Sequence, residues 1–246
     1  GPTENWDPRA GPNLVLIQDP YGQSADDCGS YLVFRKLEQN VRGFRQHIAE
    51  LAARLEANGA GLDLAGAMVI GRFLNGTPVV LNDEPQRKFE NDFRYTRSDP
   101  QGNRCPFSAH IRKTNPRGGS GTPLARERMH RIARRGITYG DFTPLNTPLE
   151  STPETGIGLL FQCCQANIAN QFEHLQRQWA SNAQFPKPKS GKDPLIGQPA
   201  NSAVRRLEFP DPWGKTSRVP FGFESFVTMK GGEYFFAPSI RFLRSL

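Results

Sequence analysis

Apolar and polar positions alternate along the chain in two regular patterns, which long irregular segments separate. In the first pattern, residues 30–37 are rich in β-branched and aromatic side chains and predict a strand. Residues 38–58 then predict a helix that ends at Asn58-Gly59. Its apolar positions repeat at helical spacing, at Val41, Phe44, Ile48, Leu51 and Leu55. Residues 62–69 predict a second, short helix that ends at Gly71.

The second pattern lies in the second half of the chain. Residues 137–139 and 158–164 predict strands. Residues 166–181 predict a helix with apolar positions on one face, at Ile168, Phe172, Leu175 and Trp179. Residues 223–230 and 233–236 predict two strands that are joined as a hairpin at Gly231-Gly232. Strand, helix, strand, strand, helix, strand is the order of a ferredoxin-like α+β fold, so we expect one antiparallel sheet with helices on one face.

Three segments lack this periodicity. Residues 1–29 predict an irregular lead-in around a short strand at 14–18, so we place the domain itself at residues 30–246. Residues 75–129 and 182–220 are rich in turn formers, and the chain as a whole holds 24 glycines and 21 prolines. A loop as long as 75–129 within a compact domain is usually functional or disordered, which makes it the first place to look for a site.

Composition limits the classes of partner. The formal net charge of +7 permits binding to a polyanion, but a solvated basic surface is the better explanation of it. The predicted strand order also suits RNA-recognition domains, yet the aromatic Lys/Arg-Gly-Phe/Tyr-Gly/Ala-Phe pattern of their central strand is absent. No apolar run approaches the roughly 18 residues that a membrane-spanning helix needs. We therefore expect neither a nucleic-acid partner nor a membrane-spanning segment.

The four cysteines indicate structural thiols. Cys28, Cys105, Cys163 and Cys164 show no Cys-x-x-Cys spacing, which disfavours a zinc or iron–sulfur site. Neighbours Cys163 and Cys164 lie on a predicted strand and point to opposite faces, so we interpret them as small core residues. Thiols without a disulfide pattern favour a reducing compartment, and we expect the cytoplasm.

The most informative chemistry lies inside the long irregular segment, at residues 104–117. His110 has a short apolar setting beside Phe107 and Ala109, and three cations, an amide and a proline follow it. A lone histidine of this kind is usually a satisfied core side chain, but in an apolar pocket it can offer a neutral nitrogen to a metal. Arginines close behind it can bind carboxylates in a bidentate manner. Heme presents both needs, because its iron takes an axial nitrogen and its propionates attract cations.

Segment 104–117 resembles the proximal heme loop of the dye-decolorizing peroxidases. Five further segments are similar to the same family and follow its order, at residues 30–41, 91–95, 130–140, 158–173 and 229–238. The resemblance therefore covers residues 30–240. It implies the ferredoxin-like fold, a heme b cofactor, and oxidation of bulky aromatic or dye-like reductants by hydrogen peroxide in one-electron steps.

The resemblance also implies roles for individual residues. His110 matches the axial iron ligand, and Arg134 matches the distal arginine that stabilises charge as the peroxide bond breaks. The remaining heme contacts are Asn115, Pro116 and Arg117 in the loop, with Arg117 as the propionate partner, and Leu159 and Phe161 as the distal wall. Plain core packing is the other interpretation of Leu159 and Phe161, and both can hold.

The sequence gives weaker indications for two further features, the acceptor for the second nitrogen of the histidine and a surface oxidation site. A ligating histidine usually donates its second nitrogen to an acceptor, and Glu173 and Asn167 on the second helix are the candidates. An exposed polar helix face explains the same two residues. Substrates too large for a heme pocket need a surface oxidation site, for which Tyr139, Trp179 and Trp213 have suitable redox chemistry.

The chain departs from the family in one respect. Family members carry a Gly-x-x-Asp-Gly loop in an N-terminal half, and no such motif occurs here; Asp26-Asp27-Cys28-Gly29 has the wrong spacing. The chain thus resembles the C-terminal half of such an enzyme. We expect an N-terminal half chain carrying that loop as a partner, or self-association into a homo-oligomer. Because the proton-moving aspartate is missing, a heme-binding, storage or delivery module without turnover is the alternative function.

Overall fold

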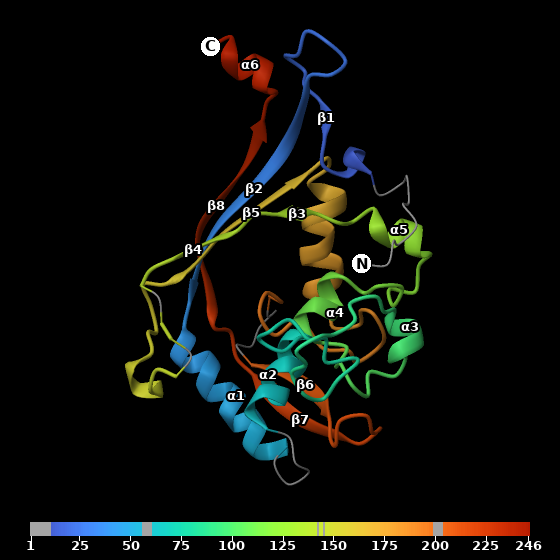
Figure 1. Ribbon diagram of the computed structural model, residues 1–246, viewed down its shortest axis with the longest axis vertical. Helices are drawn as coiled ribbons and strands as arrows, with labels where there is room; N and C mark the ends of the chain where they lie inside the picture. The colour runs from blue at the N-terminus through green and yellow to red at the C-terminus, as the bar shows by residue number, and fades with distance from the viewer. Residues whose placement is uncertain (1–10, 56–60, 142, 145, 199–203) are drawn as a thin grey trace.

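One antiparallel sheet organises the upper part of the molecule (Figure 1). The computed structural model describes residues 11–55, 61–141, 143–144, 146–198 and 204–246. Central strand β2 (Cys28–Gln39) pairs with β5 (Gly158–Gln165) on one side and with β8 (Val227–Ala237) on the other. Beyond β5 lie β3 (Ala133–Arg134) and β4 (Ile137–Tyr139), and β1 (Ile17–Gln18) pairs with the start of β2. The order β8-β2-β5-β3/β4 confirms the predicted ferredoxin-like plan.

The two faces of the sheet differ in what covers them. Residues opposite each other on neighbouring strands share a face, because side chains alternate along a strand. The helix-side face carries Val33, Arg134, Leu159, Phe161 and Cys163. The open face carries Leu32, Phe34, Ile137, Leu160 and Phe235, none of which is buried.

A single helix covers the helix-side face. It consists of η5 (Ala169–Glu173) and η6 (Leu175–Ala180), which are π-helical and meet at His174. Phe172 packs with Val33 and Cys163 beneath the sheet, where they form a small core. The prediction of a helix at 166–181 is therefore confirmed, although its turns are wider than those of an α-helix.

The main core lies away from the sheet. Helix α1 (Val41–Leu55) packs on α2 (Leu62–Ile70) and contacts β7 (Arg218–Phe223), which forms a hairpin with β6 (Arg205–Pro210). Buried residues of all four elements belong to one core. Both helices were predicted, and Gly71 closes α2 with a φ of 102°, a conformation that glycine adopts without strain. The predicted end of the first helix at Asn58-Gly59 lies outside the described residues. Leu51, Leu55, Met68, Phe209 and Phe223 are among the buried members of this core.

The hairpin predicted at Gly231-Gly232 is wrong, because β8 runs straight through both residues. Gly232 lies opposite Arg35, and a side chain there would come within 2.8 Å of the Phe34 carbonyl oxygen. Gly232 therefore serves a close approach of two strands rather than a turn, whereas a side chain at Gly231 would meet open space. The hairpin that does form, β6–β7, falls in the segment that we predicted to be irregular.

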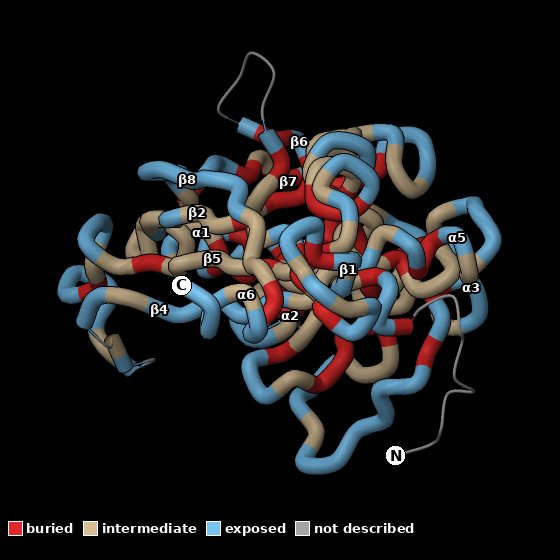
Figure 2. Tube along the Cα trace, turned by 90° about the horizontal axis from the view of Figure 1, so that it is seen from above, coloured by how far each residue is buried: buried red, intermediate tan, exposed pale blue. Residues whose placement is uncertain are grey.

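The long segment 75–129 contains three short helices, α3 (Tyr95–Ser98), α4 (His110–Thr114) and α5 (Leu124–Arg128). Figure 2 shows that buried positions continue into its irregular parts, and Val79, Val80, Phe93 and Cys105 belong to the main core. The other short helices are η2 (Pro12–Leu14), η4 (Leu149–Ser151) and α6 (Ile240–Arg244). Among the described residues, every helix is too short or too polar to cross a membrane.

Candidate functional site

His110 begins helix α4, and a buried carboxylate holds its ring. The Nδ1 atom of His110 lies 2.8 Å from Oδ2 of Asp193, whose side chain is fully buried, while the histidine side chain keeps partial exposure. The second oxygen of Asp193 accepts hydrogen bonds from the backbone N–H groups of Leu195 and Ile196. The imidazole is thereby fixed in orientation, and Nε2 is the nitrogen that remains for a ligand.

Asp193 stays ionised in this setting. Burial by itself would raise the pKa of Asp193, but the charge and hydrogen bond of His110 and the two backbone N–H groups outweigh it and hold the pKa below its usual value. Buried Arg205 supports the same loop by donating to the carbonyl oxygens of Pro194 and Gly197.

Asp193 replaces the two acceptors that we predicted for the second nitrogen of His110. Glu173 accepts a hydrogen bond from the Tyr234 hydroxyl at 3.2 Å, and Asn167 accepts one from the backbone N–H of Asn170. Asp193 lies 83 residues from His110 in a segment without periodicity, so no local pattern pointed to it.

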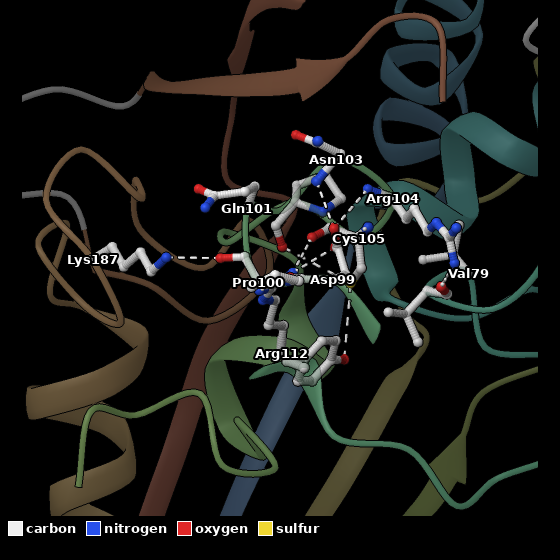
Figure 3. A network of polar contacts seen from close by, with 12 residues as sticks. Val79, Asp99, Pro100, Gln101, Asn103, Arg104, Cys105, Arg112 and Lys187 are labelled. Carbon is white, nitrogen blue, oxygen red and sulfur yellow. Dashed lines mark hydrogen bonds and ion pairs between the residues drawn. The ribbon is translucent and has the colours of Figure 1, made fainter. Parts of the chain in front are cut away.

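A second buried carboxylate anchors α4 from behind (Figure 3). Asp99 accepts a hydrogen bond from Arg112 at 2.8 Å and from the backbone N–H groups of Asn103 and Cys105. The Arg112 guanidinium lies between the rings of Tyr95 and Phe107, 4.4 and 4.3 Å from their centres. Arg112 is therefore a structural cation. Its position after His110 suggested that it could bind a cofactor carboxylate, but its buried side chain cannot reach one.

Lys113 is also buried and inward-facing. Its ammonium donates to the carbonyl oxygens of Asn182 and Phe185, which follow η6. Burial lowers the pKa of Lys113 to about 7, although the charge of Asp193 acts in the opposite direction. Because Arg112 and Lys113 both point into the protein, they fix the buried face of α4. His110 is thereby held in place at the first position of the helix.

Asn115, Pro116 and Arg117 form the turn that leaves α4. Asn115 closes the helix through its backbone N–H, and Pro116 is buried. Arg117 has a φ of 45°, an uncommon conformation for a residue with a side chain. Its guanidinium donates to the backbone oxygen of Asn91 at 2.6 Å and lies 4.2 Å from the ring centre of Phe93.

The predicted distal residues come together on the helix-side face of the sheet. Arg134 lies opposite Cys163, and Leu159 and Phe161 precede Cys163 at alternate positions of β5. Leu159 and Phe161 are half-buried, and Phe161 packs against Phe172. Arg134 is exposed, and its guanidinium makes no hydrogen bond or ion pair with the described residues.

The helix η5–η6 connects the two groups. Its first part packs under the sheet through Phe172, and its second part packs against α4. Figure 1 shows α4 beside the lower end of this helix and the sheet at its upper end. His110 and the face that carries Arg134 are therefore arranged around one helix.

The redox-active side chains differ in access. Trp179 is only 5% exposed and stacks on Phe185, so a bulky substrate cannot touch it. Tyr139 and Trp213 are half-buried and lie within reach of a cation, Lys36 and Arg104 respectively. The other histidines contact rings: His130 stacks on His174, and His47 packs against phenylalanines of the main core.

Comparison with known proteins decides the family. No protein-family model matches the chain. The chain is, however, 44% identical to the multifunctional dye peroxidase DyP2 of Amycolatopsis sp. over an alignment that covers 98% of the chain and 54% of that protein. The solved structure of DyP2 matches with a TM-score of 0.90 over 99% of the chain and 55% of its own length. The chain belongs to the dye-decolorizing peroxidase family.

Other relatives in the dye-decolorizing peroxidase family show the same coverage. The DyP-type peroxidase of Anabaena sp. is 44% identical with a TM-score of 0.88, over 99% of the chain and 51% of that structure. The dye-decolorizing peroxidase msp1 of Mycetinis scorodonius is 36% identical over 89% of the chain and 46% of that protein. The chain thus spans about half the length of the curated relatives it matches.

Proposed function

We propose that the chain is the heme-carrying part of a peroxidase that uses hydrogen peroxide to oxidise bulky aromatic or dye-like substrates in one-electron steps. The observation that carries the proposal is the 2.8 Å pair of His110 Nδ1 and Asp193 Oδ2. A carboxylate on the second nitrogen orients a ligating imidazole and makes it a stronger donor. In a family of peroxidases, such a histidine is best explained as the axial ligand.

The residues present fit heme b. The described residues hold no group of three or more His, Cys, Asp or Glu side chains suited to a metal ion, and a porphyrin requires only one axial protein ligand. Arg117 offers a half-buried guanidinium for a propionate, with Asn115 and Pro116 shaping its turn. Leu159 and Phe161 offer apolar side chains for the distal side of the heme, opposite His110.

Bound heme supplies the iron chemistry that reduces hydrogen peroxide and passes the oxidising equivalents to a reductant. Asp193 keeps His110 in one orientation and stays ionised, so Nδ1 keeps its hydrogen bond. Arg134 would donate hydrogen bonds to the peroxide oxygen on which negative charge develops, and so favour cleavage of the O–O bond. Arginine remains protonated and cannot move the proton between the peroxide oxygens, so a carboxylate or a water must do this.

We also propose that another polypeptide covers the open face of the sheet, and that a separate part of it supplies that carboxylate on the helix-side face, where Arg134 lies. The support is the exposure of the apolar side chains on the open face, 59% for Ile137 and 48% for Phe235, together with relatives about twice the matched length. An N-terminal half on a separate chain is one arrangement, and a homo-oligomer is the other. Light scattering with intact mass measurement of the protein from its native host distinguishes them; a monomer with full activity contradicts both.

The surface oxidation site is proposed at Tyr139 or Trp213, because Trp179 is too buried to meet a bulky substrate. Tyr139→Phe and Trp213→Phe should each be tested for loss of dye oxidation with unchanged peroxide reduction. The four cysteines are free thiols, which supports work in a reducing compartment such as the cytoplasm. Fractionation of the native host, with the protein recovered in an oxidising compartment, would contradict that location.

The central experiment loads the chain with heme, adds hydrogen peroxide and follows the Soret band and the oxidation of a dye. In a peroxidase, the Soret band shifts when peroxide is added and returns to its starting position when the dye is added. This cycle can be repeated many times. The matched control is His47→Gln, which alters a histidine of the main core far from α4 in the chain. Heme binding without a peroxide response would instead favour the alternative, a storage or delivery module.

A further inference from the structure

Helix α5 carries a buried carboxylate that the proposed chemistry does not use. Glu127 is 3% exposed, and among the described residues no cation pairs with it. Both of its oxygens accept a hydrogen bond from the backbone N–H of Gly118, at 2.8 and 3.0 Å, and one accepts from Ser120 at 3.3 Å. Burial of a carboxylate is unfavourable unless such hydrogen bonds replace water, so this contact is a specific one.

The backbone that Glu127 binds has an unusual conformation. Arg117 and Gly118 are both left-handed, with φ of 45° and 88°. Successive residues in turn conformations of this kind direct their N–H groups into a concavity that accepts an anion. Gly118 adopts this conformation without strain, whereas Arg117 does not. A strained residue persists only where its surroundings hold it, and the Glu127 carboxylate holds the residue that follows Arg117, Gly118.

The strained residue is the one whose guanidinium is proposed as the propionate partner. The Arg117 guanidinium is placed by Asn91 and Phe93 at one end and by its own backbone at the other. Because the backbone is set by Glu127, a change at Glu127 alters where the guanidinium points. The helix that carries Glu127 also leads directly into β3, which holds Arg134.

We propose that Glu127 is a positioning residue that presets the Arg117 loop, so that an anionic carboxylate of the cofactor meets a guanidinium already in place. This inference rests on the proposed function for the identity of the carboxylate as a heme propionate. Preset geometry lowers the conformational cost of binding, so Glu127 should act on heme affinity through Arg117 rather than by its own contact.

The test is a double-mutant cycle of Glu127→Gln and Arg117→Ala on the full chain, with heme affinity measured by titration. Glu127→Gln should weaken heme binding about tenfold or more, as expected for an outer contact of a cofactor site. In the Arg117→Ala background the same substitution should cause no further loss. Glu84→Gln, which alters an exposed carboxylate, is the matched control and should leave affinity unchanged. Additive losses in the cycle would overturn the inference.

A second readout needs no heme. Hydrogen exchange of the Gly118 and Ser120 amides in the heme-free chain should accelerate in Glu127→Gln, and Glu127→Asp should restore part of the protection. Unchanged exchange at both amides overturns the inference, whatever the heme affinities are. If the chain binds no heme at all, the proposed function fails, and the exchange data still decide whether Glu127 holds the loop. If His110→Ala loses heme but Arg117→Ala does not, the function stands and this inference is wrong.

Discussion

The histidine side and the arginine side of the candidate site are built differently. Around α4, Arg112 and Lys113 are buried and donate hydrogen bonds to buried acceptors, and Asp193 fixes His110. On the sheet, Arg134 is exposed and has no hydrogen-bonded partner among the described residues. The histidine side is therefore organised by this chain, whereas the arginine side depends on whatever covers it.

Burial explains the difference. A charge that is removed from water must be paired and hydrogen-bonded, which gives each buried group on the histidine side one position. An exposed arginine has no such constraint and samples several rotamers. The comparison predicts that substitutions on the histidine side affect folding and cofactor binding, while substitutions on the arginine side affect the reaction alone.

The largest expected effect is on stability, at Asp99. Asp99→Asn breaks the buried pair with Arg112 and leaves a buried guanidinium without its counter-charge. We expect the free energy of unfolding to fall by about 3–5 kcal/mol, measured by urea denaturation of the heme-free chain. A loss below about 1 kcal/mol, as for a surface pair, would contradict the view that α4 is anchored from behind.

The next effect is on the reaction with peroxide, at Arg134. Arg134→Leu should leave heme affinity and stability unchanged, because the side chain is exposed and unpartnered among the described residues. The rate of the peroxide reaction should fall roughly a hundredfold or more, as for loss of one charge-stabilising donor. Stopped-flow absorption of the heme-loaded chain measures it. A rate equal to that of the parent protein would show that Arg134 takes no part in the reaction. A loss of heme affinity would show that Arg134 contributes to cofactor binding, which contradicts the comparison.

A smaller effect is expected on cofactor binding, at Asp193. Asp193→Asn keeps the shape of the side chain but removes the charge that faces His110 Nδ1. Heme affinity should fall about 10- to 100-fold, with a shift in the ferric spectrum that reports a weaker imidazole donor. Glu173→Gln, at the acceptor that we first predicted, is the control and should have neither effect.

The smallest effect concerns pH, at Lys113. Its pKa is lowered to about 7 in the folded chain from 10.5, so the unfolded chain binds more protons between these values. Stability should therefore rise with pH in this window, by at most about 1.4 kcal/mol per pH unit. Burial raises the pKa of Cys105 from 9.0 to about 11, which acts in the opposite sense above pH 9, so the window to measure is pH 7 to 9. Lys113→Met should flatten the slope; an equal slope in both proteins would contradict the assignment.

Local patterns in the sequence predicted the parts of the fold that depend on neighbouring residues. The apolar repeat of α1 and the glycine after α2 are signals carried by residues that are near one another in the sequence. Both helices were therefore predicted. Gly231-Gly232 was misread because glycine serves turns and close strand contacts equally well. Leu207, Phe209, Phe221 and Phe223 alternate inward on β6 and β7, but the prolines around them obscured this signal.

The same distinction holds for the site. His110 and Arg117 could be proposed from the sequence because their neighbours in the chain carry the pattern. Asp193 and Asp99 could not, because a carboxylate becomes a partner only when folding brings it to its target. The dipeptide Asp193-Pro194 resembles many surface turns in the chain, and nothing local separates it from Asp211-Pro212.

The claim that this chain by itself completes the histidine side is tested most directly by one measurement, a heme titration of the chain alone compared with His110→Ala. We predict saturable binding of one heme with a histidine-ligated ferric spectrum, and loss of that spectrum and of tight binding in the variant. A chain that takes up no heme until another polypeptide is added, or a variant with the parent spectrum at normal occupancy, would contradict the account.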